Sequence, residues 1–258
     1  MRIAVAGGTG VAGSEVARIL AGRGHEVRVL ARSTGVDVAT GRGLDAALDG
    51  VAVVVDASSV LTTRARPSVE FFTAATTRLL AAEERAGTRL HVVLSIVGID
   101  RLGHGYYAGK LAQERLALAG PVPATVLRTT QFHEFAGQLL DRLRRGPVTV
   151  VPRAPVQPVA AREVARRLAD LTVRPAAGRV PDLAGPEPQE LADLVRRVAR
   201  SRRVGTRVVA VRLPGRLGRD LAAGALLPEA GAETGRQTFD EWLAAGTSPV
   251  PLAPGRRR

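Results

Sequence analysis

The chain has 258 residues, 45% of them hydrophobic and 24% charged, which is the composition of a globular protein and excludes a disordered one. It has no cysteine, so disulfides, thiol nucleophiles and cysteine-ligated metals are excluded, and its four histidines are too scattered for a metal motif. The net charge of +13 would suit nucleic acid, but only 3% of residues are aromatic and the arginines are spread along the chain, so we expect no nucleic-acid partner.

The first predicted element is a buried strand over residues 1–6, which a glycine-rich turn follows directly. Gly8, Gly10 and Gly13 match the pattern G-x-G-x-x-G, and Gly7, Gly10 and Gly13 match G-x-x-G-x-x-G equally well. A helix is predicted next, so the turn joins a strand to a helix, as a dinucleotide site requires. Glycines let the backbone approach a pyrophosphate, and the helix amides donate to it. The candidate cofactor-binding residues here are Gly7, Gly8, Thr9, Gly10, Val11 and Gly13.

The second strand, predicted over residues 26–31, ends without the acidic residue that binds the ribose of NAD in many such sites. Arg32 and Ser33 follow instead. A guanidinium and a hydroxyl suit a 2′-phosphate, so NADP(H) is the preferred cofactor and NAD(H) the alternative. Arg32 can also be interpreted as an ordinary surface arginine. Asp37 is a candidate acceptor for the adenine amino group, or equally a turn residue.

The third strand is predicted over residues 51–57, a nearly continuous apolar run of the kind found in parallel sheets covered on both faces. It ends in Asp56-Ala57-Ser58-Ser59. Because the carboxyl ends of such strands face the ligand crevice, Ala57 and Ser58 are expected near the cofactor. A helix over residues 68–86 and a strand over 90–94, closed by Ser95, come next.

A helix is then predicted to carry Tyr106 and Lys110, in the spacing Y-x-x-x-K. Lys110 is the only lysine among 37 basic residues, so this position is an exception in an arginine-rich chain. Residues i and i+4 share a helix face, so the phenol and the ammonium could reach one pocket, and a nearby cation lowers the pKa of a tyrosine. The alternative is an exposed lysine beside a packed aromatic residue.

The remaining elements predict an α/β fold: a Rossmann-type, doubly wound parallel sheet with helices on both faces and a small C-terminal substrate lobe. A strand over residues 125–128 leads through a loop to a helix that reaches residue 145. Helices over 162–172 and 189–200, a strand over 208–213 and two final helical stretches follow. We expect a nucleotide-binding core over residues 1–150, and a smaller lobe over 151–258 that packs on the core and is partly interleaved with it.

Taken together, the glycine turn, the strand ending in Ala31-Arg32-Ser33, Asp37-Val38, Ser95 and the YYAGK segment resemble the short-chain dehydrogenase/reductase superfamily. More narrowly, the chain resembles the atypical, NmrA-like branch of NAD(P)-binding proteins, to which the segments LRTTQF, QPVAAREVA and LAGPE are similar. The resemblance runs over most of the chain. It implies a Rossmann core, a cofactor across the strand ends and a substrate cleft covered by the C-terminal lobe.

The resemblance also implies roles for the site residues. Tyr106 would exchange a proton with the substrate oxygen, and Lys110 would hold the nicotinamide ribose and lower the pKa of Tyr106. Ser95 would hydrogen-bond the substrate carbonyl, or would merely cap the end of its strand. If the helix is rotated so that Tyr107 faces the pocket, Tyr107 takes the place of Tyr106 in this role. The loop residues that would line the substrate pocket are Gln131, Phe132 and His133, of which Phe132 is equally an ordinary core residue.

We therefore expect an NAD(P)H-dependent oxidoreductase that reduces a small carbonyl or quinone-like compound, without a metal. The superfamily's catalytic group often includes an asparagine, a residue that this chain lacks entirely. One alternative is a non-catalytic redox sensor, as some NmrA-like proteins are, with a regulatory protein partner; another is a nucleotide-sugar epimerase or dehydratase. No apolar run approaches the roughly 20 residues of a membrane span, and we expect a cytoplasmic location without a membrane partner.

Overall fold

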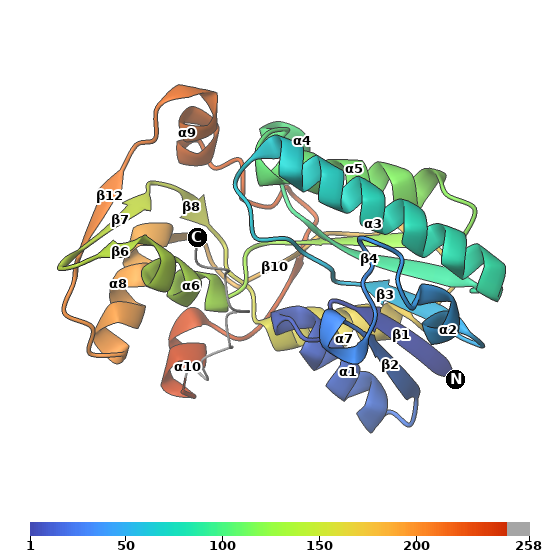
Figure 1. Cartoon of the computed structure of the whole chain (residues 1–258). Coiled ribbons are helices and arrows are strands. Elements are labelled where there is room, and N and C mark those ends of the chain that lie inside the picture. The colour runs from blue at the N-terminus through green and yellow to red at the C-terminus, as the bar shows by residue number, and fades with distance from the viewer. Residues whose placement is uncertain (247–258) are drawn as a thin grey trace.

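The centre of the computed structural model, which describes residues 1–246, is a parallel sheet (Figure 1). Its strands lie in the order β2-β1-β3-β4-β5-β10-β13, and β9 pairs with β5. Every neighbouring pair in this sheet is parallel. The strands are β1 (Arg2–Ala6), β2 (Glu26–Leu30), β3 (Val53–Asp56), β4 (Leu90–Ile96), β5 (Ala124–Thr129), β9 (Gly178–Arg179), β10 (Leu183–Ala184) and β13 (Glu233–Thr234).

Helices cover both faces of the sheet, because its strands are apolar on both sides. Ile3 and Val5 on β1 pack in one core with α1 (Val11–Gly22) and α7 (Ala161–Leu171). The alternate residues Ala4 and Ala6 pack in another core with α2 (Leu44–Leu48) and α3 (Ala65–Ala86). The helix α5 (Tyr106–Ala119) lies beside α3 on that second face (Figure 1). The predicted doubly wound Rossmann-type fold is confirmed.

The chain reverses its direction of winding between β1 and β3. From β1 it passes through α1 to β2 on one side, whereas from β3 it passes through α3 to β4 on the other. The carboxyl ends of β1 and β3 therefore frame the crevice where open α/β sheets bind their ligands.

A second core lies beside this crevice, at the left of Figure 1. It includes Leu140, Val151, Val195 and Phe239, and it lies against one face of a small sheet of order β12-β7-β6. Its elements are α6 (Glu134–Leu143), β6 (Arg144–Arg145), β7 (Val148–Pro152), β8 (Pro155–Val156), β11 (Gln189–Glu190), α8 (Leu191–Ser201), β12 (Arg207–Val211), α9 (Gly215–Ala222) and α10 (Phe239–Ala244).

The chain crosses between the two cores several times. After β7 and β8 it returns through α7, β9 and β10 to the main sheet, and after α9 it returns again through β13. A domain boundary at residue 150 stays a prediction, and residues 247–258 of the expected lobe lie outside the described part. The short helices α2 and α4 (Ile99–Leu102) were not predicted, since four or five residues are too few to show a helical period. Within residues 1–246, no helix has the length and apolar character that a bilayer crossing requires.

The start of α1 packs directly on the glycine turn. A Cβ atom at Gly13 would lie 2.2 Å from the carbonyl oxygen of Gly7, whereas a Cβ at Gly22, in the last turn of the same helix, would meet nothing within 4 Å. Gly13 therefore sets how closely α1 approaches β1.

We predict that Gly13→Ala lowers the free energy of unfolding by about 1–3 kcal/mol, because the new methyl group forces α1 away from the sheet. The matched change Gly22→Ala should leave stability unchanged or raise it by up to about 1 kcal/mol, as alanine favours helices. Urea denaturation of the two variants measures both. Equal stability of the two variants would contradict the close packing at Gly13.

Candidate functional site

The glycine turn presents bare backbone to the crevice. Gly7 has φ 71°, and a Cβ there would lie 2.5 Å from the carbonyl oxygen of Ala57, so the turn touches the chain where it leaves β3. The amide of Gly10 donates to the Gly7 carbonyl at 2.9 Å. No side chain caps α1, and no acidic residue lies in its first turn. This end of α1 thus fits the pyrophosphate of a dinucleotide, as the glycine pattern predicts.

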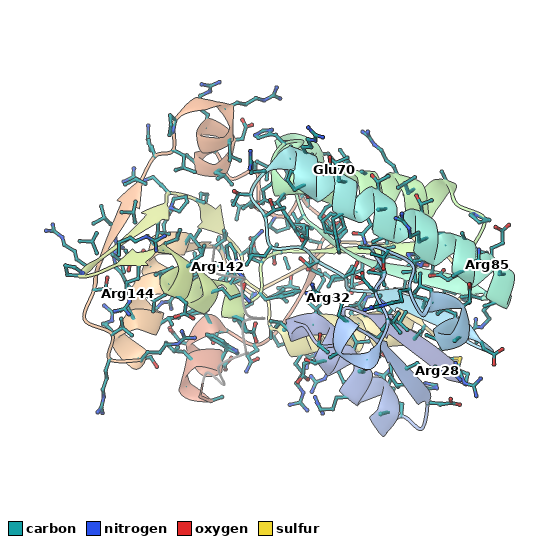
Figure 2. All side chains as sticks on the ribbon, in the orientation of Figure 1. Arg28, Arg32, Glu70, Arg85, Arg142 and Arg144 are labelled. Carbon is teal, nitrogen blue, oxygen red and sulfur yellow. The ribbon has the colours of Figure 1, made fainter. Side chains whose placement is uncertain are left out.

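The end of β2 carries the two residues expected to select the cofactor. Arg32 and Ser33 are both exposed, in a short 3-10 helix over Arg32–Thr34. Figure 2 shows Arg32 on the side of the sheet toward the lobe, while Arg85 lies at the far end of α3. The carboxylate of Asp37 accepts a hydrogen bond from the amide of Ala39 at 3.0 Å, and its backbone pairs with Arg42. These contacts support the turn-residue interpretation of Asp37.

The segment that leaves β3 supplies two serine hydroxyls, and the sequence analysis assigned a role only to Ser58. Ser58 is buried, and its Oγ makes no hydrogen bond within the described part of the chain. The next residue, Ser59, is exposed, and its Oγ lies 2.8 Å from the Tyr106 hydroxyl oxygen. Ser59 belongs to the quoted Asp56-Ala57-Ser58-Ser59 run, and only the position of α5 reveals its partner.

The helix phase distinguishes the two tyrosines. Tyr106 faces α3 and the β3 exit: its ring packs edge-on against Phe72, with centroids 5.7 Å apart, and its backbone carbonyl accepts from the Ser68 hydroxyl at 2.8 Å. Tyr107 packs instead against the second core. The arrangement favours Tyr106 as the residue that faces the crevice.

The ionisation of Tyr106 differs from the sequence-based expectation. Burial raises the pKa of Tyr106, and the hydrogen bond with Ser59 opposes this by favouring the phenolate. The Lys110 ammonium takes other partners and does not lower the pKa of the phenol, so the structure contradicts the expected lowering. The phenol of Tyr106 is therefore protonated at neutral pH, which suits a general acid.

Lys110 is buried beneath the carboxyl end of β4. Its Nζ donates to the Leu94 carbonyl at 2.6 Å and to the Gln113 Oε1, and lies 4.9 Å from the centre of the Phe72 ring. Burial lowers the pKa of Lys110 to about 8, against the opposing effect of Asp56 and Glu114. The expected exposed-lysine alternative is wrong, because only 3% of Lys110 is accessible.

Ser95 lies near the end of β4, in register with Arg128 of β5. It is 1% exposed, and its Oγ makes no hydrogen bond within residues 1–246. A cap on the strand end would use this oxygen, and these contacts show no such bond. The expected bond to the substrate carbonyl stays a prediction.

The three loop residues expected to line the pocket differ in their surroundings. Gln131 is partly buried, and its Oε1 has no hydrogen-bond partner in the described chain. Phe132 packs against the main core, which supports the core interpretation. His133 is fully buried: its Nε2 lies 3.1 Å from the Gln237 carbonyl oxygen, and its ring packs edge-on against Phe239 and tilted against Trp242. Burial lowers the pKa of His133, so we interpret His133 as a packing residue of the lobe.

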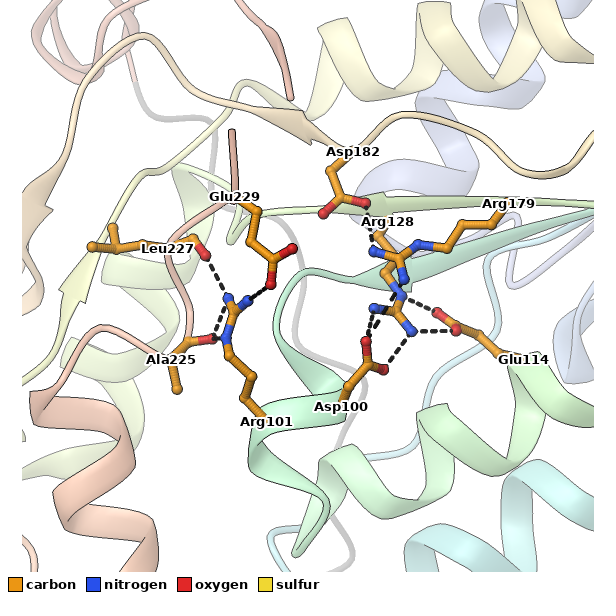
Figure 3. A network of polar contacts seen from close by, with 9 residues as sticks. All are labelled: Asp100, Arg101, Glu114, Arg128, Arg179, Asp182, Ala225, Leu227 and Glu229. Carbon is orange, nitrogen blue, oxygen red and sulfur yellow. Dashed lines mark hydrogen bonds and ion pairs between the residues drawn. The ribbon is translucent and has the colours of Figure 1, made fainter. Parts of the chain in front are cut away.

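An ion-pair network centred on the buried pair of Arg128 and Glu114 fixes the helix that carries Tyr106 (Figure 3). Arg128 on β5 donates to both oxygens of Glu114 on α5, each at 2.7 Å, and to both oxygens of Asp100 on α4. Arg101 on α4 donates to the carbonyls of Ala225 at 2.9 Å and Leu227 at 2.6 Å. The network therefore links α5, through α4, to the lobe. No three histidine or acidic side chains in the described chain gather as a metal ion would require.

No family model and no curated protein matches the chain, but solved structures match over most of it. MoeE5 in complex with UDP-glucose and NAD is 20% identical, with a TM-score of 0.72, and the match covers 95% of this chain and 96% of MoeE5. A short-chain dehydrogenase/reductase superfamily protein from Agrobacterium tumefaciens with bound NAD is 19% identical, with a TM-score of 0.66 and 95% of each chain covered.

A dTDP-4-dehydrorhamnose reductase from Clostridium acetobutylicum is 14% identical, with a TM-score of 0.71, and the match covers 95% of this chain and 98% of the reductase. These identities establish the fold. The chain has the Rossmann-type fold of NAD-binding proteins, and its structural neighbours include members of the short-chain dehydrogenase/reductase superfamily.

We predict that the phenol of Tyr106 ionises at a higher pH in the folded protein than in the unfolded chain, because burial raises its pKa. The absorbance at 295 nm of Tyr107→Phe, which leaves one tyrosine, measures this directly. The added change Ser59→Ala should move the midpoint higher still, since the serine hydroxyl stabilises the phenolate. A midpoint at or below that of the unfolded chain would contradict the burial of Tyr106.

Proposed function

We propose that the protein is a nicotinamide-dinucleotide-dependent oxidoreductase that uses Tyr106 as its proton donor and acceptor. One observation carries the proposal: the segment leaving β3 touches both the glycine turn, at Gly7 and Ala57, and the Tyr106 hydroxyl, at Ser59. A dinucleotide seated on the start of α1 would therefore have the phenol beside it.

The residues present fit this cofactor. The turn at Gly7 and the uncapped start of α1 would hold the pyrophosphate, and the unpartnered hydroxyl of Ser58 would meet the part of the cofactor over the strand ends. The cofactor supplies a hydride donor or acceptor at its nicotinamide ring. Tyr106 would transfer the proton to or from the substrate oxygen, and the Ser95 hydroxyl would bind that oxygen.

We propose NADP(H) as the preferred cofactor. Arg32 and Ser33 are exposed directly after β2, where no carboxylate is available for the ribose hydroxyls of NAD. The charge of the guanidinium favours a 2′-phosphate. The substrate would be a small carbonyl or quinone-like compound. We keep the NmrA-like placement as part of this proposal, on the segments LRTTQF, QPVAAREVA and LAGPE.

A nucleotide-sugar epimerase or dehydratase is the second candidate. It is favoured by the likeness over nearly the whole chain to MoeE5, whose structure contains UDP-glucose and NAD. In an epimerase the hydride returns to the sugar within one turnover, so no net cofactor oxidation would accompany its reaction. A redox sensor would bind the cofactor with no turnover at all.

We predict that Tyr106→Phe slows NADPH oxidation by about 10²–10⁴-fold, the usual contribution of a general acid, with unchanged NADPH affinity. A panel of aldehydes, ketones and quinones, followed at 340 nm, provides the rate of the unaltered protein. Tyr107→Phe is the matched control and should retain most of the activity, because Tyr107 packs in the second core.

The same panel separates the candidates. Equal rates in Tyr106→Phe and the unaltered protein would refute the assigned role of the phenol. No NADPH oxidation with any acceptor, but conversion of UDP-glucose without net oxidation, would favour the epimerase. Cofactor binding with neither reaction would favour the sensor.

We predict that Arg32→Ala weakens NADPH binding by about 10–100-fold, the value of one charge-assisted hydrogen bond, and leaves NADH binding unchanged. Calorimetric titration of both cofactors measures this. Arg85→Ala is the control, since Arg85 pairs with Asp45 at the far end of α3. An equal loss of affinity for NADPH and NADH would show that Arg32 does not bind the 2′-phosphate.

A further inference from the structure

A continuous series of hydrogen bonds between buried polar groups connects Lys110 to the end of β3. The Lys110 ammonium donates to the Gln113 Oε1, and the Gln113 Nε2 donates to the Asp56 Oδ2 at 2.7 Å. The other carboxylate oxygen of Asp56 accepts from the Ser58 amide at 2.9 Å. Asp56 and Gln113 are both fully buried. These hydrogen bonds thus connect α5 to the segment that contacts the glycine turn.

The chemistry of the three groups allows only one orientation of the amide. An ammonium can only donate and an ionised carboxylate can only accept, so the amide oxygen of Gln113 must face Lys110 and its nitrogen must face Asp56. Neither aspartate nor glutamine was assigned a role from the sequence. Gln113 lies three residues after Lys110, the spacing that brings side chains to one helix face, and this is the signal that could have identified it.

Charge balance explains why these hydrogen bonds link Lys110 to Asp56. A buried ammonium is costly unless an opposite charge and hydrogen bonds compensate it. Of the carboxylates near Lys110, Glu114 is already held by Arg128 through two hydrogen bonds. Asp56 has no arginine partner in the described chain, so its charge is the one directed, through Gln113, at the lysine.

The other titratable groups that face this region have partners of their own. Glu83 on α3 and His91 on β4 form a buried pair close to Asp56, with the His91 Nδ1 2.8 Å from a Glu83 oxygen. Tyr106 bonds Ser59. Neither the pair nor the phenol contacts the Lys110 ammonium.

We propose that Gln113 is a positioning residue that couples the Lys110 ammonium to the Asp56 carboxylate, so that the amine stays charged and fixed at the carboxyl end of β4. The proposal rests on the proposed function, because the resemblance to the superfamily implies that Lys110 holds the nicotinamide ribose. The coupling exists in the protein alone, because all three groups belong to this chain, and it can be measured without substrate.

The single lysine makes the test direct. Protein grown with [ε-13C]lysine gives one lysine resonance, and its shift against pH reports the pKa of Lys110, expected near 8 in the unaltered protein. Gln113→Met keeps the volume but removes both hydrogen bonds, and Asp56→Asn removes the charge. Each should lower the midpoint by about one pH unit or more, because Gln113→Met removes a hydrogen-bond acceptor of the ammonium and Asp56→Asn removes its counter-charge.

Gln157→Met is the matched control, since the amide of Gln157 donates to the Gly185 carbonyl, away from Lys110, and should leave the titration unchanged. An unchanged midpoint in both test variants, or a shift in only one of them, would overturn the proposal. Where one variant does not fold, as judged by circular dichroism, the other decides alone.

The test separates failure of the coupling from failure of the proposed function. Lowered midpoints in a protein that binds neither NADPH nor NADH would support the coupling and refute the oxidoreductase. Cofactor binding with unchanged midpoints would refute the coupling and leave the choice between oxidoreductase and sensor to the activity assays.

Discussion

The site depends on the contact between the glycine turn and the segment that leaves β3. At Gly7 the backbone of the turn lies so close to the Ala57 carbonyl that no side chain fits between them. This contact joins the carboxyl ends of β1 and β3 at the point where the sheet changes its direction of winding. Because Ser59 follows two residues later, the same contact determines where the phenol of Tyr106 lies relative to the glycine turn.

The helix that carries Tyr106 and Lys110 is held by buried charge as well as by packing. Arg128 binds Glu114 through two hydrogen bonds, and Asp56 reaches Lys110 through Gln113. Buried charges contribute little net stability, but removing one partner of such a pair is strongly destabilising, because the other charge is left unpaired. These pairs therefore restrict α5 to one position and one rotation, and this restriction keeps Tyr106 toward the crevice and Tyr107 in the lobe.

Much of the main parallel sheet could be predicted from local patterns. The apolar strands, the glycine turn and the end of β2 each depend on neighbouring residues, so their places follow from the order of the sequence. The candidate site could be predicted less completely from the sequence. The sequence analysis expected Lys110 to act on Tyr106, but its ammonium is directed to Leu94 and Gln113. His133 was expected in the pocket, but it packs in the lobe against Phe239, a residue that lies more than a hundred positions later.

The sequence by itself determined that a strand, a glycine turn and a helix would follow one another at the start of the sheet, because periodicity and glycine spacing act over a few residues. It also singled out the chain's one lysine and the tyrosine four residues before it. Only the tertiary structure decided the partners of these groups. Hydrogen bonds such as those of Ser59 with Tyr106 and Asp56 with Gln113 join residues 47 and 57 positions apart. Such contacts depend on how α5 packs between strands and helices, which no local pattern encodes.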